Sequence, residues 1–346
     1  MAFLLSTIIT QLIISHGYKF SHLILDNDLI SPQKIHKIAV SRIGGVAIFI
    51  SFFIVTIIFE ELNSENIKNN TIFQALIAGY LIFLIGLVED ITRNLSVKLR
   101  LILTATILLV MSYLLNIQIE RTGVEFLDHI LDNKIFSVLF TIFAITGLIN
   151  SYNIIDGVNG LTCFTSITSL FSLLIASSQF YDPNIFFLTL VSISSILGFF
   201  IFNYPRGLIF IGDGGAYLLG FLIAIFSIFL INNVEEISPF FIILINIYPI
   251  TETLFSIYRR INNGQSPGSP DLNHLHSLIY SKLAIGNTKN KSIKLNSASS
   301  IYIWPYIALS NILAIIFCTN SYYLILFIII LFIIYLITYK ILLKIQ

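Results

Sequence analysis

Amides, carboxylates and glycines recur in short clusters along this sequence, at spacings suited to binding a metal ion and phosphate groups. The clearest cluster is NSYNIIDGVNGL at residues 150–161, in which Asn150, Asn153 and Asp156 stand three residues apart. That spacing places their side chains along one side of a helix until the glycines after Asp156 open it. Backbone freed at such a break can approach a ligand closely, so the pattern favours a ligand site over amides that only join neighbouring helices.

Two further clusters place carboxylates at helix ends. Glu89 and Asp90 follow a long apolar run, where the partial negative charge of a helix C-terminus disfavours them and a bound divalent cation would relieve the repulsion. The alternative is a solvated loop start neutralised by Arg93 or Lys98. Asp213 opens another apolar run, and its flanking glycines and helix N-terminus would suit a phosphate or a metal-phosphate unit. A plain N-cap would explain this Asp but not the glycines around it.

Two histidines and a group of basic residues complete the set. DLNHLH places His274 and His276 two residues apart, so in extended backbone both imidazoles could face one anionic group. A zinc site is less favoured, because no third nitrogen or sulfur ligand stands at a useful spacing. KIHKIAVSRIGG adds the basic residues Lys34, His36 and Arg42 before an apolar run. Basic residues in such a place commonly set orientation or contact lipid head groups.

The composition is that of a membrane protein. Of the 346 residues, 56% are hydrophobic and only 11% are charged, and the formal net charge is +1. Because soluble domains carry about 25% charged residues, a soluble enzyme, a disordered chain and a nucleic-acid binder are all disfavoured. The two cysteines, Cys163 and Cys318, fall inside apolar runs and imply neither a disulfide framework nor a thiolate metal site.

Eleven runs are long and apolar enough to cross a bilayer, whose roughly 30 Å core needs about 20 apolar residues in a helix. Their approximate limits are 2–22, 43–59, 71–88, 99–115, 135–152, 161–179, 184–202, 214–231, 237–258, 300–318 and 321–343. Of the 19 Lys and Arg residues, 16 fall in loops on one side, which we therefore assign to the cytoplasm. The sequence predicts an all-α integral membrane protein, a polytopic bundle of about eleven transmembrane helices with an external N-terminus and a cytoplasmic C-terminus.

This topology brings every cluster to the cytoplasmic side. We expect residues 1–346 to form a single transmembrane catalytic domain, in which residues 259–299 form a cytoplasmic loop that carries the histidines. Most other connections are too short to fold independently. Any chemistry must therefore be built from helix ends, short loops and that one segment.

In this order the clusters resemble the motifs of the polyprenyl-phosphate N-acetylhexosamine-1-phosphate transferases, the MraY/WecA type of glycosyltransferase family 4. NSYNIIDGVNGL is similar to the family's Asn-x-x-Asn-x-x-Asp-Gly-x-Asp/Asn-Gly-Leu signature, and FIGDGGAYLLG to its Phe-x-Gly-Asp-x-Gly-Ser/Ala-x-x-Leu-Gly signature. GLVEDITRNLSVK resembles its aspartate-rich stretch, DLNHLH its histidine motif, and KIHKIAVSRIGG its Lys-x-His leading to Arg-x-Gly-Gly. Glu89 stands where the family usually has Asp, a variant that resembles a subgroup acting in surface-polysaccharide and O-antigen synthesis.

The resemblance implies transfer of N-acetylhexosamine-1-phosphate from a UDP-sugar to undecaprenyl phosphate, with release of UMP, in a bacterial inner membrane. The implied cofactor is Mg²⁺, with Mn²⁺ as the alternative, because Mg²⁺ favours oxygen ligands shared with substrate phosphates. The site residues that it implies are, as metal ligands, Asp213, Asp90 and Glu89; as catalytic residues, Asp90, Asp156, Asp213, His274 and His276; and as substrate-binding residues, Arg42, Asn153, Asn159, Phe210 and Gly157.

Alternatives remain open for the donor and for the function. The donor is UDP-GlcNAc or a 6-deoxy relative. A second candidate enzyme is a phospho-MurNAc-pentapeptide transferase of peptidoglycan synthesis. The sequence GLVED at residues 86–90 and the histidine pair resemble that enzyme less closely. A cation-coupled transporter would place acids near mid-membrane between inverted repeats, whereas these acids fall at helix ends. The expected partners are the UDP-sugar, undecaprenyl phosphate and membrane lipid, without nucleic acid, and a homodimer is left open.

Overall fold

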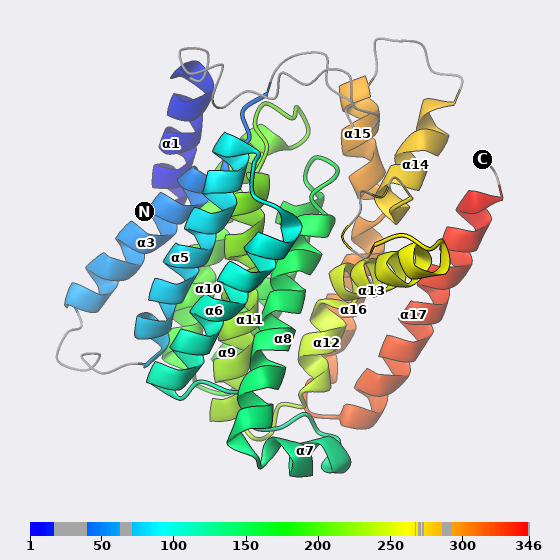
Figure 1. The fold of residues 1–346 in the computed structure, drawn as a ribbon. Helices are drawn as coiled ribbons and strands as arrows, with labels where there is room; N and C mark the ends of the chain where they lie inside the picture. The colour runs from blue at the N-terminus through cyan, green and yellow to red at the C-terminus, as the bar shows by residue number, and fades with distance from the viewer. Residues whose placement is uncertain are drawn as a thin grey trace.

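The computed structural model describes residues 1–16, 40–62, 71–266, 268, 271, 273–285 and 292–344, and this part of the chain is helical apart from short connections. The helices, in chain order, are α1 (Ala2–His16), α3 (Gly45–Leu62), α5 (Thr71–Thr92), α6 (Val97–Leu115), α7 (Glu125–Leu131), α8 (Lys134–Ile154), α9 (Leu161–Gln179), α10 (Pro183–Asn203), α11 (Gly212–Asn233), α12 (Phe240–Ile245), α13 (Ile247–Asn262), α14 (Leu275–Ala284), α15 (Ser292–Ile301), α16 (Trp304–Ile316) and α17 (Ser321–Leu343). Most run side by side as a bundle (Figure 1).

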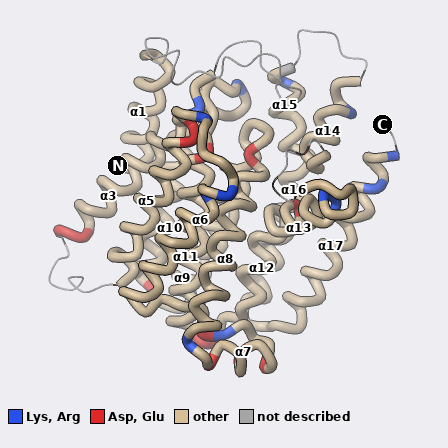
Figure 2. The backbone as a smooth tube through the Cα atoms, viewed as in Figure 1, with Lys and Arg blue, Asp and Glu red and all other residues tan. Residues whose placement is uncertain are grey.

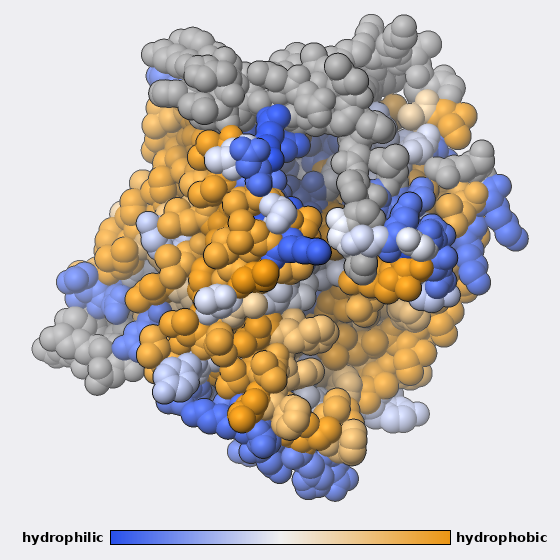
Figure 3. Space-filling model, viewed as in Figure 1, coloured by the Kyte–Doolittle hydropathy of each residue, from blue (hydrophilic) through white to orange (hydrophobic). Residues whose placement is uncertain are grey.

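The bundle has the surface of a polytopic membrane protein. Among the described residues, nine helical segments are long and apolar enough to cross a bilayer, and the shorter α1 is also apolar. Apolar side chains cover much of the face shown in Figure 3, and many of the charged residues lie toward the two ends of the bundle (Figure 2). These features confirm the predicted all-α membrane fold. Of the predicted span 2–22, the described part is α1; its remainder lies outside the described residues.

The prediction of one continuous helix over residues 237–258 is wrong. The chain breaks at Asn246, and α13 then lies across the bundle rather than along it (Figure 1). Pro249 contributes to the break: the carbonyl of Ile245 would accept the N–H of residue 249, but proline has none. The hydroxyl of Ser169 donates to that carbonyl instead, at 2.9 Å. Hydropathy alone does not detect this break, because apolar residues continue on both sides of it.

Polar side chains fix where several of the helices begin. The side chains of Ser96, Asn133, Asp182 and Asn320 each accept a backbone N–H of the turn that follows, at the starts of α6, α8, α10 and α17. These N-caps satisfy amides that have no partner inside a helix, which matters most where water is scarce. The starts of these four helices lie within about two residues of those predicted from the apolar runs.

Helix α11 lies at the centre of the bundle and is almost completely buried. Glycines allow its first turn to come unusually close to two neighbours. A Cβ built on Gly86 of α5 would lie 2.5 Å from the Cα of Gly214, and one on Gly45 of α3 would overlap the backbone of Gly215. Only glycine fits such contacts. The close packing brings Asp90, one turn beyond Gly86, to the start of α11.

Candidate active site

The carboxylate of Asp90 caps the N-terminus of α11 from the neighbouring helix α5. Its Oδ1 accepts the backbone N–H of Asp213 at 2.8 Å, and its Oδ2 accepts that of Gly214 at 2.9 Å. Asp90 is buried, with 5% of its surface exposed. The partial positive charge of the helix N-terminus stabilises a carboxylate in this position. Two residues predicted to act together from separate motifs are thus in direct contact.

The side chain of Asp213 contacts residues of two further helices, α6 and α8. The guanidinium of Arg100 on α6 donates to its Oδ2, and the amide of Asn153 on α8 donates to its Oδ1 at 2.9 Å. Asp213 itself is partly exposed. Sequence reasoning missed Arg100, although a basic residue one turn inside an apolar helix was a usable signal. Helices α6, α8 and α11 therefore meet at one carboxylate.

The segment that carries Arg42 pairs with the chain just before α11. The N–H of Phe210 donates to the carbonyl of Ser41 at 2.8 Å, and the N–H of Gly44 donates back to the carbonyl of Phe210 at 3.0 Å. This pairing brings Arg42 close enough to Asp156 to stabilise its charge. Phe210, predicted to bind substrate, is half-buried here. Two other predicted basic residues of this motif, Lys34 and His36, lie outside the described residues.

Asp156 lies in the turn between α8 and α9. It accepts the hydroxyl of Thr162 at 3.0 Å and is half-buried. Burial, with a smaller contribution from the nearby charge of Asp213, raises the pKa of Asp156 to about 7, while Thr162 and Arg42 act in the opposite direction. A carboxyl with such a pKa can hold or release a proton near neutrality.

Asn159, also predicted to bind substrate, is buried against α15. Its backbone N–H donates to Oδ1 of Asn296 at 2.7 Å, and its side-chain amide donates to the hydroxyl of Ser297 at 3.2 Å. These bonds join the loop between α8 and α9 to α15. The contact with substrate stays a prediction, and the observed contacts of Asn159 hold this loop against α15. Neither Asn296 nor Ser297 stood out in the sequence.

The two histidines lie side by side, with ring centroids 5.4 Å apart and ring planes nearly parallel. Nδ1 of His274 lies 2.9 Å from Oε1 of Glu252, a fully buried residue of α13. His276 packs against Gly157, where an added Cβ would overlap its Nε2. Burial, and then the neighbouring His274, lowers the pKa of His276 to about 3, so this imidazole is neutral at pH 7. Sequence reasoning missed Glu252, although an acid within an apolar run is a functional signal.

The predicted residues thus form two adjoining groups. Asp90, Asn153 and Asp213 are linked directly around the start of α11. The histidines form the second group, which reaches the first through the loop at Gly157. Glu89 is half-buried beside Asp90, and one of its oxygens accepts the N–H of Leu95 at 2.8 Å. The predicted site is therefore assembled from motifs that are far apart in sequence.

The donor atoms around Asp213 suit a hard cation. Asp213 and Asp90 offer carboxylate oxygens there and the side-chain amide of Asn153 an amide oxygen, and Mg²⁺ prefers such ligands. In the part of the chain that the structure describes, however, no three His, Cys, Asp or Glu side chains converge as a complete cage. Mg²⁺ commonly binds through one or two carboxylates together with substrate phosphates. The residues present fit that mode of binding and not an all-protein cage.

Comparison with known proteins gives a consistent set of relatives. The family model described as glycosyl transferase family 4 matches residues 72–231, from α5 to α11. A Bacillus subtilis (strain 168) protein named probable undecaprenyl-phosphate N-acetylglucosaminyl 1-phosphate transferase is 29% identical over 265 residues, which cover 76% of this chain and 71% of the relative. A Thermotoga maritima protein named undecaprenyl-phosphate alpha-N-acetylglucosaminyl 1-phosphate transferase is 28% identical over 294 residues, covering 83% of this chain and 86% of the relative. A Mycolicibacterium smegmatis protein named decaprenyl-phosphate N-acetylglucosaminephosphotransferase is 25% identical over 303 residues, covering 79% and 71% respectively.

Proposed function

We propose that the chain is a glycosyl transferase family 4 enzyme that transfers N-acetylglucosamine-1-phosphate from UDP-GlcNAc to undecaprenyl phosphate and releases UMP. The names of its relatives support the acceptor and the sugar. The observation that carries the proposal is the arrangement at the start of α11, where Asp213 contacts Asn153 and Arg100 and is held by Asp90.

The reaction requires two anions to meet. An oxygen of the lipid phosphate attacks the β-phosphorus of the UDP-sugar, a new P–O bond forms, and the bond to the bridging oxygen breaks so that this oxygen leaves with UMP. Catalysis of such a step depends on positioning and on charge neutralisation. Arg42 and Arg100 supply positive charge.

Asp156 serves best as a group that positions the acceptor. The second pKa of a phosphate monoester is about 6, so the lipid phosphate is mostly ionised near pH 7 and needs little help from a base. With a pKa raised to about 7, Asp156 is partly protonated there and can donate a hydrogen bond to a phosphate oxygen. A neutral carboxyl also repels an approaching anion less than a carboxylate does.

The proposed cofactor is Mg²⁺, with Mn²⁺ as an alternative. Asp213 would hold it, with Asp90 and Glu89 beside it, and when bound it would neutralise charge that develops on the diphosphate. Asn153 orients Asp213 through its amide. Asp90 already accepts two backbone N–H groups, so its main part is to fix the helix that presents Asp213.

We place the active site at the cytoplasmic face of a bacterial inner membrane. The distribution of basic residues supports this orientation, because 16 of 19 fall on the side that carries the motifs. The product would begin O-antigen or another cell-surface polysaccharide. Glu89, which stands where Asp is usual, supports that assignment over peptidoglycan synthesis.

One assay tests the proposal directly. Membranes containing the protein are incubated with undecaprenyl phosphate, Mg²⁺ and, one at a time, radiolabelled UDP-GlcNAc, a 6-deoxy UDP-N-acetylhexosamine and UDP-MurNAc-pentapeptide. We expect equal amounts of UMP and lipid-linked label with UDP-GlcNAc, and loss of both when EDTA removes the metal. Product from another donor only would change the substrate. Absence of product from every donor, with folded and inserted protein, would reject the transferase and make cation-coupled uptake the next assay.

A further inference from the structure

The histidine motif is attached to α13 by a buried carboxylate that α17 also contacts. Oε1 of Glu252 lies 2.9 Å from Nδ1 of His274, and Oε2 accepts the hydroxyl of Tyr335 on α17 at 2.9 Å. The backbone N–H of Leu275 donates to Oε2 as well, at 3.2 Å. Two donors, the Tyr335 hydroxyl and the Leu275 N–H, therefore hold this carboxylate beside the His274 ring, which is the arrangement expected for an ionised group in a buried place.

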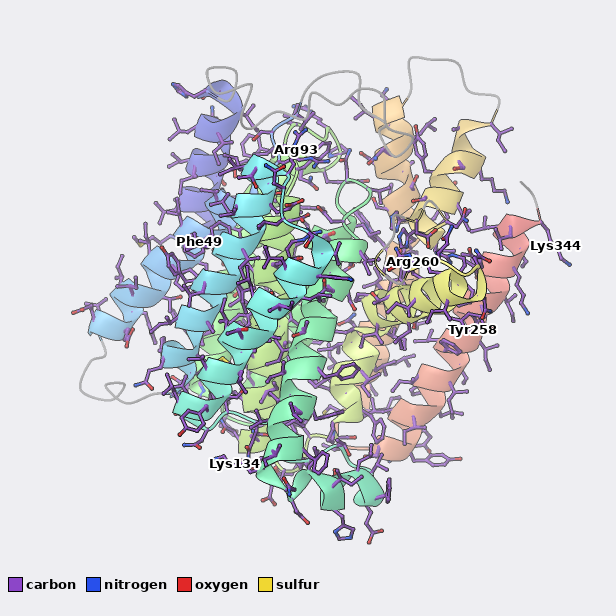
Figure 4. All side chains as sticks on the ribbon, viewed as in Figure 1. Phe49, Arg93, Lys134, Tyr258, Arg260 and Lys344 are labelled. Atoms are coloured by element: carbon purple, nitrogen blue, oxygen red, sulfur yellow. The ribbon has the colours of Figure 1, made fainter. Side chains whose placement is uncertain are left out.

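A second contact repeats this pattern two turns farther along α13. Arg259 donates to the carboxylate of Asp271, at the start of the histidine motif, and to the hydroxyl of Tyr339 at 3.0 Å. Arg260 lies on the side of α13 that faces α14, and Tyr258 lies on the opposite side (Figure 4). Helices α13 and α17 thus hold the motif at both Asp271 and His274.

We propose that Glu252 is a positioning residue that sets the ring orientation and the tautomer of His274 during transfer; this inference rests on the proposed function. An ionised carboxylate can only accept hydrogen bonds, so Nδ1 of His274 must carry the hydrogen. Nε2, on the opposite edge of the ring, is then the atom left to meet a phosphate or sugar group of the substrate.

A purely structural role explains these contacts less well. Glu252 is fully buried, and apolar residues of similar volume can hold two helices together as well as a buried charged pair does. His274 also stacks on His276, whose Nε2 lies against Gly157 in the loop that carries Asp156. The orientation that Glu252 imposes on His274 is thereby tied to the loop at the reaction centre.

A double-mutant cycle tests whether Glu252 acts through His274. Glu252→Gln keeps the shape but offers an amide, and we expect kcat to fall by about tenfold or more with little change in KM for the UDP-sugar. In a His274→Asn background the same change should alter kcat by less than about twofold. Glu125→Gln, in α7 at the other end of the bundle, is the matched control and should leave kcat unchanged (Figure 1). Losses that simply add in the double variant would overturn the proposal.

A second variant and a spectroscopic readout cover the other outcomes. If Glu252→Gln does not fold, Tyr335→Phe enters the same cycle, with a smaller loss expected because the carboxylate stays on His274. The ¹⁵N chemical shifts of the His274 ring should report Nδ1–H in the wild type and a shift toward Nε2–H in Glu252→Gln, since an amide can donate to Nδ1. An unchanged tautomer would reject the inference. Because this readout needs no turnover, a wild type that transfers no sugar would count against the proposed function alone.

Discussion

The carboxylate of Asp90 accepts the backbone N–H of Asp213 at 2.8 Å, so an acid from one motif caps the helix that begins with the acid of another. The contact explains how both acids can occupy one small region. The charge of Asp90 is offset by the start of α11, which leaves the side chain of Asp213 to contact Arg100 and Asn153. Of the two acids, Asp213 is therefore the one placed to meet a cation or a phosphate.

Replacing Asp213 by Asn should abolish most of the transfer. The change removes the charge that Arg100 and a bound cation would share, and we expect kcat to fall by about 100-fold or more. Asp132→Asn, at an exposed site after α7, serves as the matched control and should retain wild-type turnover. Both proteins should insert and unfold at similar temperatures. Turnover of Asp213→Asn near the wild-type rate would remove Asp213 from the metal site.

Replacing Gly86 by Ala should lower both stability and activity by moving α5 away from α11. The added Cβ would lie 2.5 Å from the Cα of Gly214, so α5 and α11 must separate and the contact between Asp90 and Asp213 must lengthen. We expect a lower unfolding temperature and a lower kcat. Gly147→Ala is the control, because no atom lies within 4 Å of a Cβ built there. Equal behaviour of the two variants would contradict the close helix contact.

Asp156 should make stability depend on pH. Its pKa is raised from about 3.9 in the unfolded chain to about 7 in the folded protein, so the folded state binds more protons between these values. The contribution of this residue to stability should therefore fall as pH rises from about 4 to about 7, and then level off. Unfolding temperatures of purified protein between pH 5 and 8 should decline less in Asp156→Asn than in the wild type. Parallel curves would show that Asp156 has no raised pKa.

Arg100 should matter through its charge. Arg100→Gln leaves Asp213 without its guanidinium partner, and we expect a fall in kcat of about tenfold or more, whereas Arg100→Lys should keep part of the activity because the charge remains. Lys98→Gln, two residues earlier in α6 and exposed, is the matched control. Steady-state UMP release measures all three. A loss in Lys98→Gln as large as that in Arg100→Gln would point to general surface charge rather than to the ion pair.

The sequence was a good guide to elements whose physical cause is local. Long apolar runs predicted the helices α5 and α11 to within a few residues, because lipid exposure demands such runs. The glycine-flanked acids were also predicted to act together, and the structure places Asp90 against the backbone of Asp213. The predicted topology supported this grouping, because it brings the helix ends that carry Asp90 and Asp213 to the same side of the membrane.

What the sequence did not reveal depends on contacts between distant residues. The break before α13 follows from Pro249 together with the hydroxyl of Ser169, which is 80 residues away in the chain. Glu252, which lies beyond that break on α13, meets His274, 22 residues away in the chain. For Asn159 the motif predicts a substrate contact, which stays a prediction, and it gave no sign that the buried amide of this residue joins α15.

The dependence of the histidine motif on Tyr335 and Tyr339 has a consequence for biosynthesis. All the motifs described above are translated before α17. Yet α17 supplies the hydroxyls of Tyr335 and Tyr339, which contact Glu252 and Arg259, the two residues that hold the histidine motif. A nascent chain that has inserted every earlier helix still lacks those two bonds. Translation thus adds α17 after every motif, and we expect the histidine motif to gain its full set of contacts only once this helix has entered the membrane.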